Sequence, residues 1–472
     1  MLSERPSLIL TARQLGASMT QELPNSVEMH VARAARQRPR MRKARALRKA
    51  EKNERKVLRR LENAVAAGDT ERAKHLQCLY LKSFSSSLKA TSDANKRIKS
   101  RHRRRFDEVQ SIAECLDPWA GTQAEVVAYA KRKPDGSFRV IMDFPLEHRA
   151  LQTIVTRAIK PFIRLDPRQH AYANGGRNEA CNRIIDAINR GGKWFTGLDI
   201  EQFYNTITRQ HILQHIHIPE RIADAVICAP ENIRFRQTCG IMRSTLANVA
   251  REGISQGSSL SPLIAEAIIA HFLQDISTAA AIVNFADDFG VMARTLSELE
   301  AITMALTSAL RRCPSGSLQL RPKSPPRRVS DGVDFLGYRF RRRKGHLSIM
   351  PSEKNQIKFF AKTLDYLRAM RRGNPGAAGR FQRYVKSWAQ AFPHWDCGDD
   401  LLWPRIWVNG VARQHLPTAL SFAKYAMRQH EGRFMPLHSS FPPVVRTPFD
   451  QHAVSQVEHW TDINPVGFRS IH

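Results

Sequence analysis

The sequence predicts a mixed α/β (α+β) fold, in which short strands alternate with helices behind a basic helical N-terminal segment. Three observations support this prediction. Apolar, strand-like runs end at carboxylates, namely at Asp199 and at the adjacent pair Asp287 and Asp288. Segments with helical apolar spacing separate these runs, and lysine and arginine dominate much of the first hundred residues. A chain of 472 residues that is 42% hydrophobic is long enough to bury a core in each of several domains.

The charge of the chain narrows its class of partner. The formal net charge is +31, which is far too large for a neutral metabolic enzyme and indicates a polyanionic partner, with a membrane surface as the competing interpretation. No apolar run reaches the roughly 18 residues that a membrane-spanning helix needs, and the N-terminus lacks a secretory pattern. We therefore expect a cytoplasmic protein with no membrane partner. The seven cysteines are odd in number and include no C-x-x-C pair, so neither a disulfide framework nor a zinc finger is expected.

The N-terminal region contains two basic blocks, 33–60 and 96–105, both of which we predict to be helical. Five leucines and one valine from 58 to 81 recur at spacings compatible with one helical face, and Asp69 after Ala67 and Gly68 is expected to cap a helix. A solvated pair of charged helices is the alternative. Acids are too few to pair with these cations, so we expect contact with nucleic-acid phosphates.

From Tyr129 onward the sequence predicts alternating strands and helices. The dipeptide Asp135-Gly136 is typical of a hairpin turn. We expect strands at 138–142, 194–198, 282–285, 291–293 and 335–340. We expect helices at 146–163, 178–189, 260–278, 359–370 and 381–392.

The paired carboxylates are the strongest candidates for chemistry. Asp287 and Asp288 lie between two apolar runs, so we place them at the tip of a tight β-hairpin, where two like charges are costly without a cation. A solvated turn is the alternative for the pair alone. A third carboxylate, Asp199, ends another apolar strand. Mg²⁺ prefers oxygen ligands, and two such ions can hold the attacking and leaving oxygens of a phosphoryl transfer. This pattern predicts two Mg²⁺ ions, with Mn²⁺ as a substitute.

A further segment, Ser255-Gln-Gly-Ser-Ser-Leu-Ser-Pro262, opens an apolar helix between Asp199 and the pair. Its glycine lets the backbone approach a nucleotide, although it could serve as a helix cap alone. In this order the segments resemble the polymerase motifs of reverse transcriptases, particularly the bacterial class that includes group II intron and retron enzymes, over about 132–392. The resemblance implies a right-hand polymerase. Its expected domains are an RNA-binding basic helical extension at 1–115, fingers at 116–195, a palm at 196–345, a helical thumb at 346–425 and a tail of unknown role at 426–472.

The resemblance also implies a role for each matching residue. Asp199, Asp287 and Asp288 match the metal ligands, joined by Ile200, and Lys323 matches a lysine that can act as general acid near the pyrophosphate. The incoming nucleotide is expected to contact Arg139, Tyr204, Gln256, Gly257 and Phe285, with Tyr204 excluding a ribose 2′-hydroxyl. Template and primer are expected at Arg149, Gln152, Phe335, Leu336 and Gly337. Phe285 departs from the family, which usually has tyrosine there.

The function that the resemblance implies is RNA-directed DNA polymerisation, with dNTPs, an RNA template and a DNA product as partners. The template is expected to be a dedicated structured non-coding or intron RNA. The sequence shows no Cys-rich endonuclease segment of the kind found in many mobile intron proteins, so we expect a stand-alone enzyme, with antiviral defence as one setting. Two alternatives stay open: template-independent or protein-primed DNA synthesis, and a group II intron maturase or splicing factor. The oligomeric state is left open.

Overall fold

The computed structural model describes residues 23–133, 136–274, 276, 281–312 and 318–395. The predicted tail, the end of the predicted thumb from 396, and Asp135 of the predicted turn lie outside these residues. The chain divides into two compact units. The first comprises Met1–Arg164 and Gln202–His271, and the second comprises Leu165–Glu201 and Phe272–His472.

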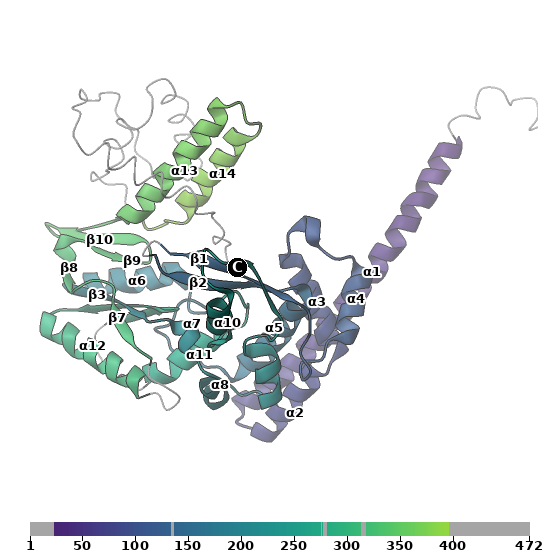
Figure 1. The fold of residues 1–472 in the computed structure, drawn as a ribbon, viewed down its shortest axis with the longest axis horizontal. Coiled ribbons are helices and arrows are strands. Elements are labelled where there is room, and N and C mark those ends of the chain that lie inside the picture. Colours follow the sequence, from purple (N-terminus) through teal and green to yellow (C-terminus); the bar gives the residue numbers. More distant parts are fainter. Residues whose placement is uncertain (1–22, 134–135, 275, 277–280, 313–317, 396–472) are drawn as a thin grey trace, which may run out of the picture. The chain divides into compact units, whose positions relative to one another are not determined.

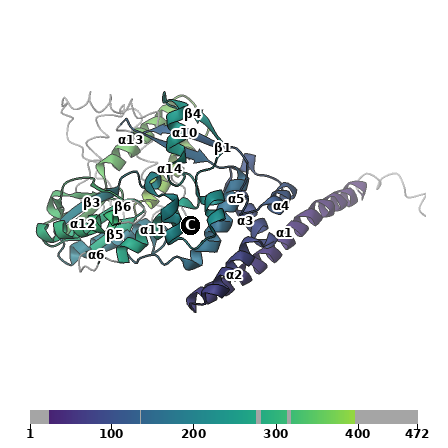
Figure 2. The ribbon, with the colours of Figure 1, turned by 60° about the horizontal axis from the view of Figure 1, so that its bottom comes forward.

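The first unit begins with a helical layer. Its helices are α1 (Leu23–Ala66), α2 (Thr70–Leu81), α3 (Phe84–Arg97) and α4 (Phe106–Cys115). α1 is a long rod, and α2 and α3 pack along its later half (Figures 1 and 2). Asp69 accepts a hydrogen bond from the Arg72 amide at 3.1 Å, which confirms the predicted cap. Burial of Leu61 and Leu76 between α1 and α2 gives these basic helices an apolar seam.

The second basic block is mostly not helical, contrary to the prediction. α3 ends at Arg97, and only a 3₁₀ turn, Ser100–His102, follows before α4. Arg103 donates to the carbonyl of Lys96 at 2.7 Å and to that of Ile98 at 3.0 Å, so its side chain satisfies the end of α3. Ile98 is the single apolar residue of the block, and a continuous helix would therefore have had no apolar face to bury.

A three-stranded sheet follows in the first unit. Its strands are β1 (Val126–Arg132), β2 (Phe138–Asp143) and β4 (Ile233–Gln237), in the order β2-β1-β4. β1 is antiparallel to β2 and parallel to β4. Val126, Ala128 and Ala130 alternate into the core with Leu246 of α10 (Arg243–Arg251). The predicted strand at 138–142 is confirmed, whereas β1, β4 and α10 were not predicted as elements.

The remaining helices of this unit are mostly short. α5 (Leu146–Ile159) ends in a 3₁₀ turn, Lys160–Phe162, so the predicted helix to 163 tightens over its last residues. After the chain returns at Gln202 there follow α7 (Phe203–Thr206), α8 (Arg209–His215), α9 (Glu220–Ile222) and a π-helical turn, Ala223–Ile227. α11 (Ser261–Gln274) is the apolar helix predicted from 260, and its described part ends four residues before the predicted end.

The second unit contains the sheet that carries the carboxylates. Its strands are β3 (Trp194–Ile200), β5 (Ala281–Phe285), β6 (Asp288–Ala293), β7 (Leu320–Pro322) and β8 (Arg327–Arg328). They are antiparallel in the order β5-β6-β3-β7, and β8 also pairs with β3. The predicted strands at 194–198, 282–285 and 291–293 are confirmed and extended. α6 (Gly176–Asn189) and α12 (Leu296–Arg311) accompany this sheet.

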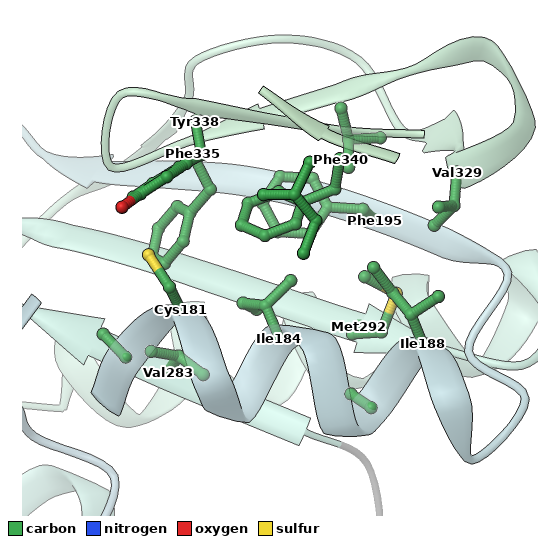
Figure 3. Close-up of a cluster of buried hydrophobic side chains, with 14 of the residues drawn as sticks. Cys181, Ile184, Ile188, Phe195, Val283, Met292, Val329, Phe335, Tyr338 and Phe340 are labelled. Atoms are coloured by element: carbon green, nitrogen blue, oxygen red, sulfur yellow. The ribbon is translucent and has the colours of Figure 1, made fainter. Parts of the chain in front are cut away.

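A second sheet of this unit has the order β11-β10-β9, from β9 (Val333–Phe335), β10 (Tyr338–Arg343) and β11 (His346–Pro351). The predicted single strand at 335–340 is wrong, because the chain reverses at Leu336 and Gly337, with φ of +47° and +84°. Figure 3 shows Cys181, Ile184 and Ile188 of α6 pointing into the core that these sheets enclose. Phe195, Phe335 and Phe340 complete that core.

Two helices follow the second sheet, α13 (Glu353–Arg371) and α14 (Ala377–Gln390). α13 contains the helix predicted at 359–370, whereas α14 begins four residues before the helix predicted at 381–392 and ends two residues before its predicted end. Buried Phe359 and Phe381 hold them together. Trp388 lies with its ring centroid 4.4 Å from that of Phe359, so it belongs to this core. No helix within the described residues combines the length and the apolar character that crossing a membrane requires.

Candidate active site

The paired carboxylates lie at the tip of a β-hairpin, as predicted. β5 and β6 pair up to Phe285 and Asp288, which leaves Ala286 and Asp287 as the turn. Ala286 has a left-handed backbone with φ of +55°. Buried Asn284 donates from Nδ2 to the carbonyl of Ala286 at 2.8 Å and to that of Asp288 at 3.2 Å, so one amide side chain fixes both ends of the turn.

The third carboxylate meets the pair through strand register. β3 lies beside β6 with Asp199 directly opposite Asp288. One carboxylate oxygen from each of Asp199, Asp287 and Asp288 lies within 4.8 Å of the others. Like charges in direct cross-strand register destabilise a sheet. The arrangement therefore needs a cation.

Burial intensifies that need. Burial raises the pKa of the Asp287 carboxyl above its ordinary value, and the charges of Asp288 and Asp199 raise it further. Burial also raises the pKa of Asp288, although the Lys323 ammonium partly offsets this effect. Oxygen ligands of this kind suit a hard divalent cation.

Lys323 is the cation that the chain itself provides. Its Nζ contacts Oδ1 of Asp288 and lies 3.4 Å from Oδ1 of Asp199. Burial lowers the pKa of this ammonium, but Asp288 and Asp199 outweigh burial, and the pKa is raised. The backbone amide of Lys323 donates to the carbonyl of Gly197 at 2.8 Å, so the backbone of Lys323 is held against β3. Ile200 follows Asp199, and its amide donates to the carbonyl of Asp287 at 3.1 Å.

Phe335, Leu336 and Gly337, which are expected to contact the primer, form the end of β9 and the turn into β10 in the same unit. The carbonyl of Gly337 accepts from the Ser352 amide at 2.8 Å and from Asn355 Nδ2 at 3.0 Å. Phe335 is buried, and its ring would lie 3.0 Å from a Cβ at Gly290. Gly290 is on β6, two residues after Asp288. Phe335 therefore packs beneath the hairpin, and Phe285 is half-buried where that hairpin turns.

Comparison with known families identifies the kind of domain that contains these carboxylates. The model of the family described as reverse transcriptase (RNA-dependent DNA polymerase) matches residues 131–340. These residues form a reverse transcriptase domain. The match spans all five strands of the carboxylate sheet and confirms the predicted right-hand polymerase fold class. It identifies the domain as that of an RNA-directed DNA polymerase, which is a nucleotidyltransferase.

Among solved structures, the chain is similar to two telomerases. One is apo telomerase from Candida tropicalis truncated from its C-terminal domain, with 10% identity, a TM-score of 0.32, and coverage of 48% of this chain and 56% of that chain. The other is telomerase from Candida albicans in complex with a fragment of telomeric RNA, with 13% identity, a TM-score of 0.30, and coverage of 73% and 68%. No curated protein sequence matches the chain.

Gln256 and Gly257 of the reverse transcriptase domain lie in the first unit, against β2. The carbonyl of Gln256 accepts from the Met142 amide at 2.8 Å, and a Cβ at Gly257 would lie 2.2 Å from the Met142 carbonyl oxygen. Gln152 is buried, and its Oε1 accepts from the Ser259 amide at 3.1 Å. Gln152 thus positions the same turn, while its expected template contact stays a prediction.

The other first-unit candidates surround this turn or β2. Arg139 is exposed on β2 directly opposite Lys131 of β1, so two cations face each other across the sheet. Arg149 donates to Asp143 Oδ1 at 2.7 Å and to the Phe144 carbonyl at 2.6 Å. Tyr204 is half-buried, and its carbonyl accepts from the Ile254 amide at 2.8 Å. The roles expected of these three residues stay predictions.

Sequence reasoning missed the residues that hold the hairpin in place. The side chain of Asn284 hydrogen-bonds the turn, and the backbone amide of Asn284 donates to the carbonyl of Arg168 at 2.8 Å. Arg168 in turn bonds Asp166 and the carbonyls of Leu273 and Ile276. One signal was available, because a polar asparagine inside the apolar run Ala281-Ile-Val-Asn-Phe285 is costly to bury without partners.

Proposed function

We propose that the chain is an RNA-directed DNA polymerase that adds dNTPs to a primer 3′ end by two-metal phosphoryl transfer. The observation that carries the proposal is the convergence of Asp199, Asp287 and Asp288 within 4.8 Å inside a reverse transcriptase domain. Three half-buried acids with one lysine leave an excess of negative charge that divalent cations would neutralise.

The donor set fits two Mg²⁺ ions, with Mn²⁺ as a substitute, because all side-chain ligands are carboxylate oxygens. Asp199, Asp287 and Asp288 would hold the ions, together with the backbone carbonyl of Ile200. Bound ions would supply charge stabilisation for the attacking and leaving oxygens. Lys323, which contacts Asp288, would donate a proton to the leaving pyrophosphate.

The remaining candidates have proposed roles in holding substrates. Arg139 would contact the triphosphate. The positive charge of Lys131, directly opposite on β1, supports this role. Tyr204, Gln256, Gly257 and Phe285 would each contact the nucleotide. Arg149 and Gln152 would support the template, and Phe335, Leu336 and Gly337 the primer strand. The basic helix α1 would contact RNA phosphates.

For the biological setting we propose a bacterial enzyme of the group II intron and retron class that acts on a dedicated structured RNA in antiviral defence. This proposal is supported by the order and the residue sequence of the motifs, together with the basic N-terminal helices. A phage challenge of cells that express the wild-type chain or an Asp287→Asn/Asp288→Asn variant tests this setting. Equal protection by both would remove DNA synthesis from the role.

The enzymatic proposal is tested by purifying the chain with its bound nucleic acid, adding dNTPs and Mg²⁺, and sequencing the DNA. We expect DNA complementary to one co-purified RNA. The Asp287→Asn/Asp288→Asn variant should lose at least about 100-fold of this synthesis and keep most of its RNA affinity, because charge stabilisation at a reacting centre is worth that much or more. Asp186→Asn, an exposed acid on α6, is the matched control and should keep its activity.

Other outcomes would contradict the proposal in distinct ways. DNA without any matching RNA would indicate untemplated or protein-primed synthesis on the same three carboxylates. A tightly held structured RNA with no DNA product would favour a maturase or splicing factor.

A further inference from the structure

The second unit carries a group of cations that lies away from the carboxylate triad of Asp199, Asp287 and Asp288. We call it the β10–β11 basic surface. It comes from three segments, 190–193, 327–331 and 341–346, which contain eight lysines and arginines and a single acid, Asp331. Its cations are Arg190, Lys193, Arg327, Arg328, Arg341, Arg342, Arg343 and Lys344. The last two lie at the exposed tip of the hairpin between β10 and β11.

Hydrogen bonds join the three segments into one surface. Arg341 donates from Nε to the carbonyl of Ser330 at 3.2 Å, and Arg342 donates to the carbonyl of Ile188, near the end of α6, at 2.9 Å. The Val329 amide donates to the carbonyl of Lys193 at 2.9 Å. Figure 3 shows Val329 and Ile188 at the same end of the core. The cations therefore sit on a rigid scaffold.

These charges are not neutralised within the part of the chain that the structure describes. The neighbouring Arg339 pairs with Asp334 at 2.7 Å, but none of the eight surface cations lies within ion-pair distance of a described carboxylate. In cross-strand register Arg341 faces Ser348, and Arg343 faces His346. Arg341 and Arg343 share one face of β10, roughly 7 Å apart. A row of uncompensated arginines on a fixed strand is typical of a surface that meets an anion from outside.

The surface is separate from the active site. Trp194, at the start of β3, pairs with Arg328, whereas Asp199 of the same strand pairs with Asp288. Five residues of strand separate these positions, which corresponds to about 16 Å.

We infer that the β10–β11 basic surface binds the phosphate backbone of a double-helical part of the RNA that the enzyme carries. The inference rests on the proposed function for the identity of its partner and adds a second contact outside the polymerisation site. Its role would be to retain one structured RNA while the primer end moves through the active site.

The chemistry of the surface favours a helix over a single strand. Proteins bind single strands through aromatic rings on which bases stack. Here the Arg328 guanidinium covers the ring of Trp194, with its Cζ 5.0 Å from the ring centroid, so that face of the ring is occupied. Helical RNA is recognised through its phosphates and shape. A lipid surface would call for exposed apolar side chains beside the cations, and the hairpin tip offers lysine, glycine and histidine instead.

The test compares Arg341→Gln/Arg343→Gln/Lys344→Gln with the wild-type chain. Binding of a fully paired RNA hairpin is measured from about 50 to 200 mM salt. We expect affinity at low salt to fall at least about tenfold. The negative slope of log affinity against log salt should become shallower by about 2 to 3, since each lost phosphate contact contributes roughly 0.9 to its magnitude. Arg342 is kept, because it bonds the end of α6. Arg311→Gln/Arg312→Gln at the end of α12 is the matched control and should leave the slope unchanged.

Three further measurements can overturn the inference. Extension of a short primer–template by the triple variant should equal that of the wild type, and a matching loss would place the surface on the polymerisation track. Stronger competition by an unpaired RNA than by the hairpin would indicate a single-strand site. A lipid contact would be indicated if the triple variant bound phosphatidylserine vesicles less tightly than the wild type but bound the RNA hairpin equally well. If wild-type extension is itself absent, the proposed function fails, whereas the hairpin-binding result still stands.

Discussion

Gly257 shows at the scale of one residue how the nucleotide turn depends on its backbone. Its φ of +114° lies where residues with a Cβ are strained, and an added Cβ would lie 2.2 Å from the carbonyl oxygen of Met142. That oxygen belongs to the backbone of β2, which cannot rotate away as a flexible side chain would. The same turn is tied to β2 by the Gln256 carbonyl and to α5 by Gln152.

We expect Gly257→Ala to destabilise the first unit by about 2 to 4 kcal/mol, because strain at positive φ and a backbone clash add together. The Michaelis constant for dNTPs should rise in the folded fraction. Urea unfolding and steady-state kinetics measure the two effects. Gly240→Ala is the control, since Gly240 also has positive φ, +79°, but an added Cβ would meet nothing within 4 Å. Equal losses in both variants would mean that the approach to Met142 is unimportant.

Among elements, the three helices α1, α3 and α5 are joined by a cluster of buried and half-buried charges. Arg157 of α5 donates to Glu54 of α1 and to Asp93 of α3, each at 2.7 Å. Tyr80 also donates to Glu54 at 2.9 Å. Burial raises the pKa of Asp93, but the hydrogen bonds from Lys89 and Arg157 outweigh it, and the pKa is held well below its ordinary range. The N-terminal extension is thus tied to α5 through charged groups as well as through apolar packing.

We expect Arg157→Met to destabilise the first unit by about 3 to 5 kcal/mol, because it leaves Glu54, with a side chain only 8% exposed, without its partner. Arg209→Met is the matched control. Arg209 pairs with Glu220 and Asp224 on the surface, where solvent screens the pair, so its loss should cost much less stability than the loss of Arg157. Denaturant unfolding of the two variants gives the comparison. A loss at Arg157 as small as that at Arg209 would show that the buried cluster adds no specific stability.

The contrast between elements shows what the sequence could and could not predict. The strands that end at Asp199 and at the hairpin were predictable, because apolar runs that end in carboxylates are a local pattern. β4 reads Ile-Arg-Phe-Arg-Gln and gains its identity by pairing with β1, more than a hundred residues earlier in the chain. The role of Asn284 likewise depends on a turn that forms only when β5 and β6 pair. Arg157 and Glu54 are 103 residues apart, so no local pattern joins them.

At the scale of the whole molecule, the response to pH is expected to depend on histidines of the first unit, of which His148 and His211 are buried and His215 is half-buried. His215 of α8 and His271 of α11 have ring centroids 4.6 Å apart, and His211 is fully buried nearby in the chain. Burial lowers the pKa of His215 to about 4, and the neighbouring charges of His271 and His211 act in the same direction. Burial also lowers the pKa of His148. In the unfolded chain His215 and His148 would titrate near pH 6.5.

Acid should therefore weaken the first unit. A histidine with a lowered folded pKa contributes its full stability above its unfolded pKa, and that stability is lost as the pH falls from about 6.5 to about 4. We expect His215 to account for about 1 kcal/mol of this loss, after allowance for its partial exposure. Hydrogen exchange at pH 7 and pH 5 should show faster opening of α8, after correction for the intrinsic exchange rate, and His215→Gln should remove part of the difference. An unchanged pH dependence in that variant would show that another group governs the acid sensitivity of this unit.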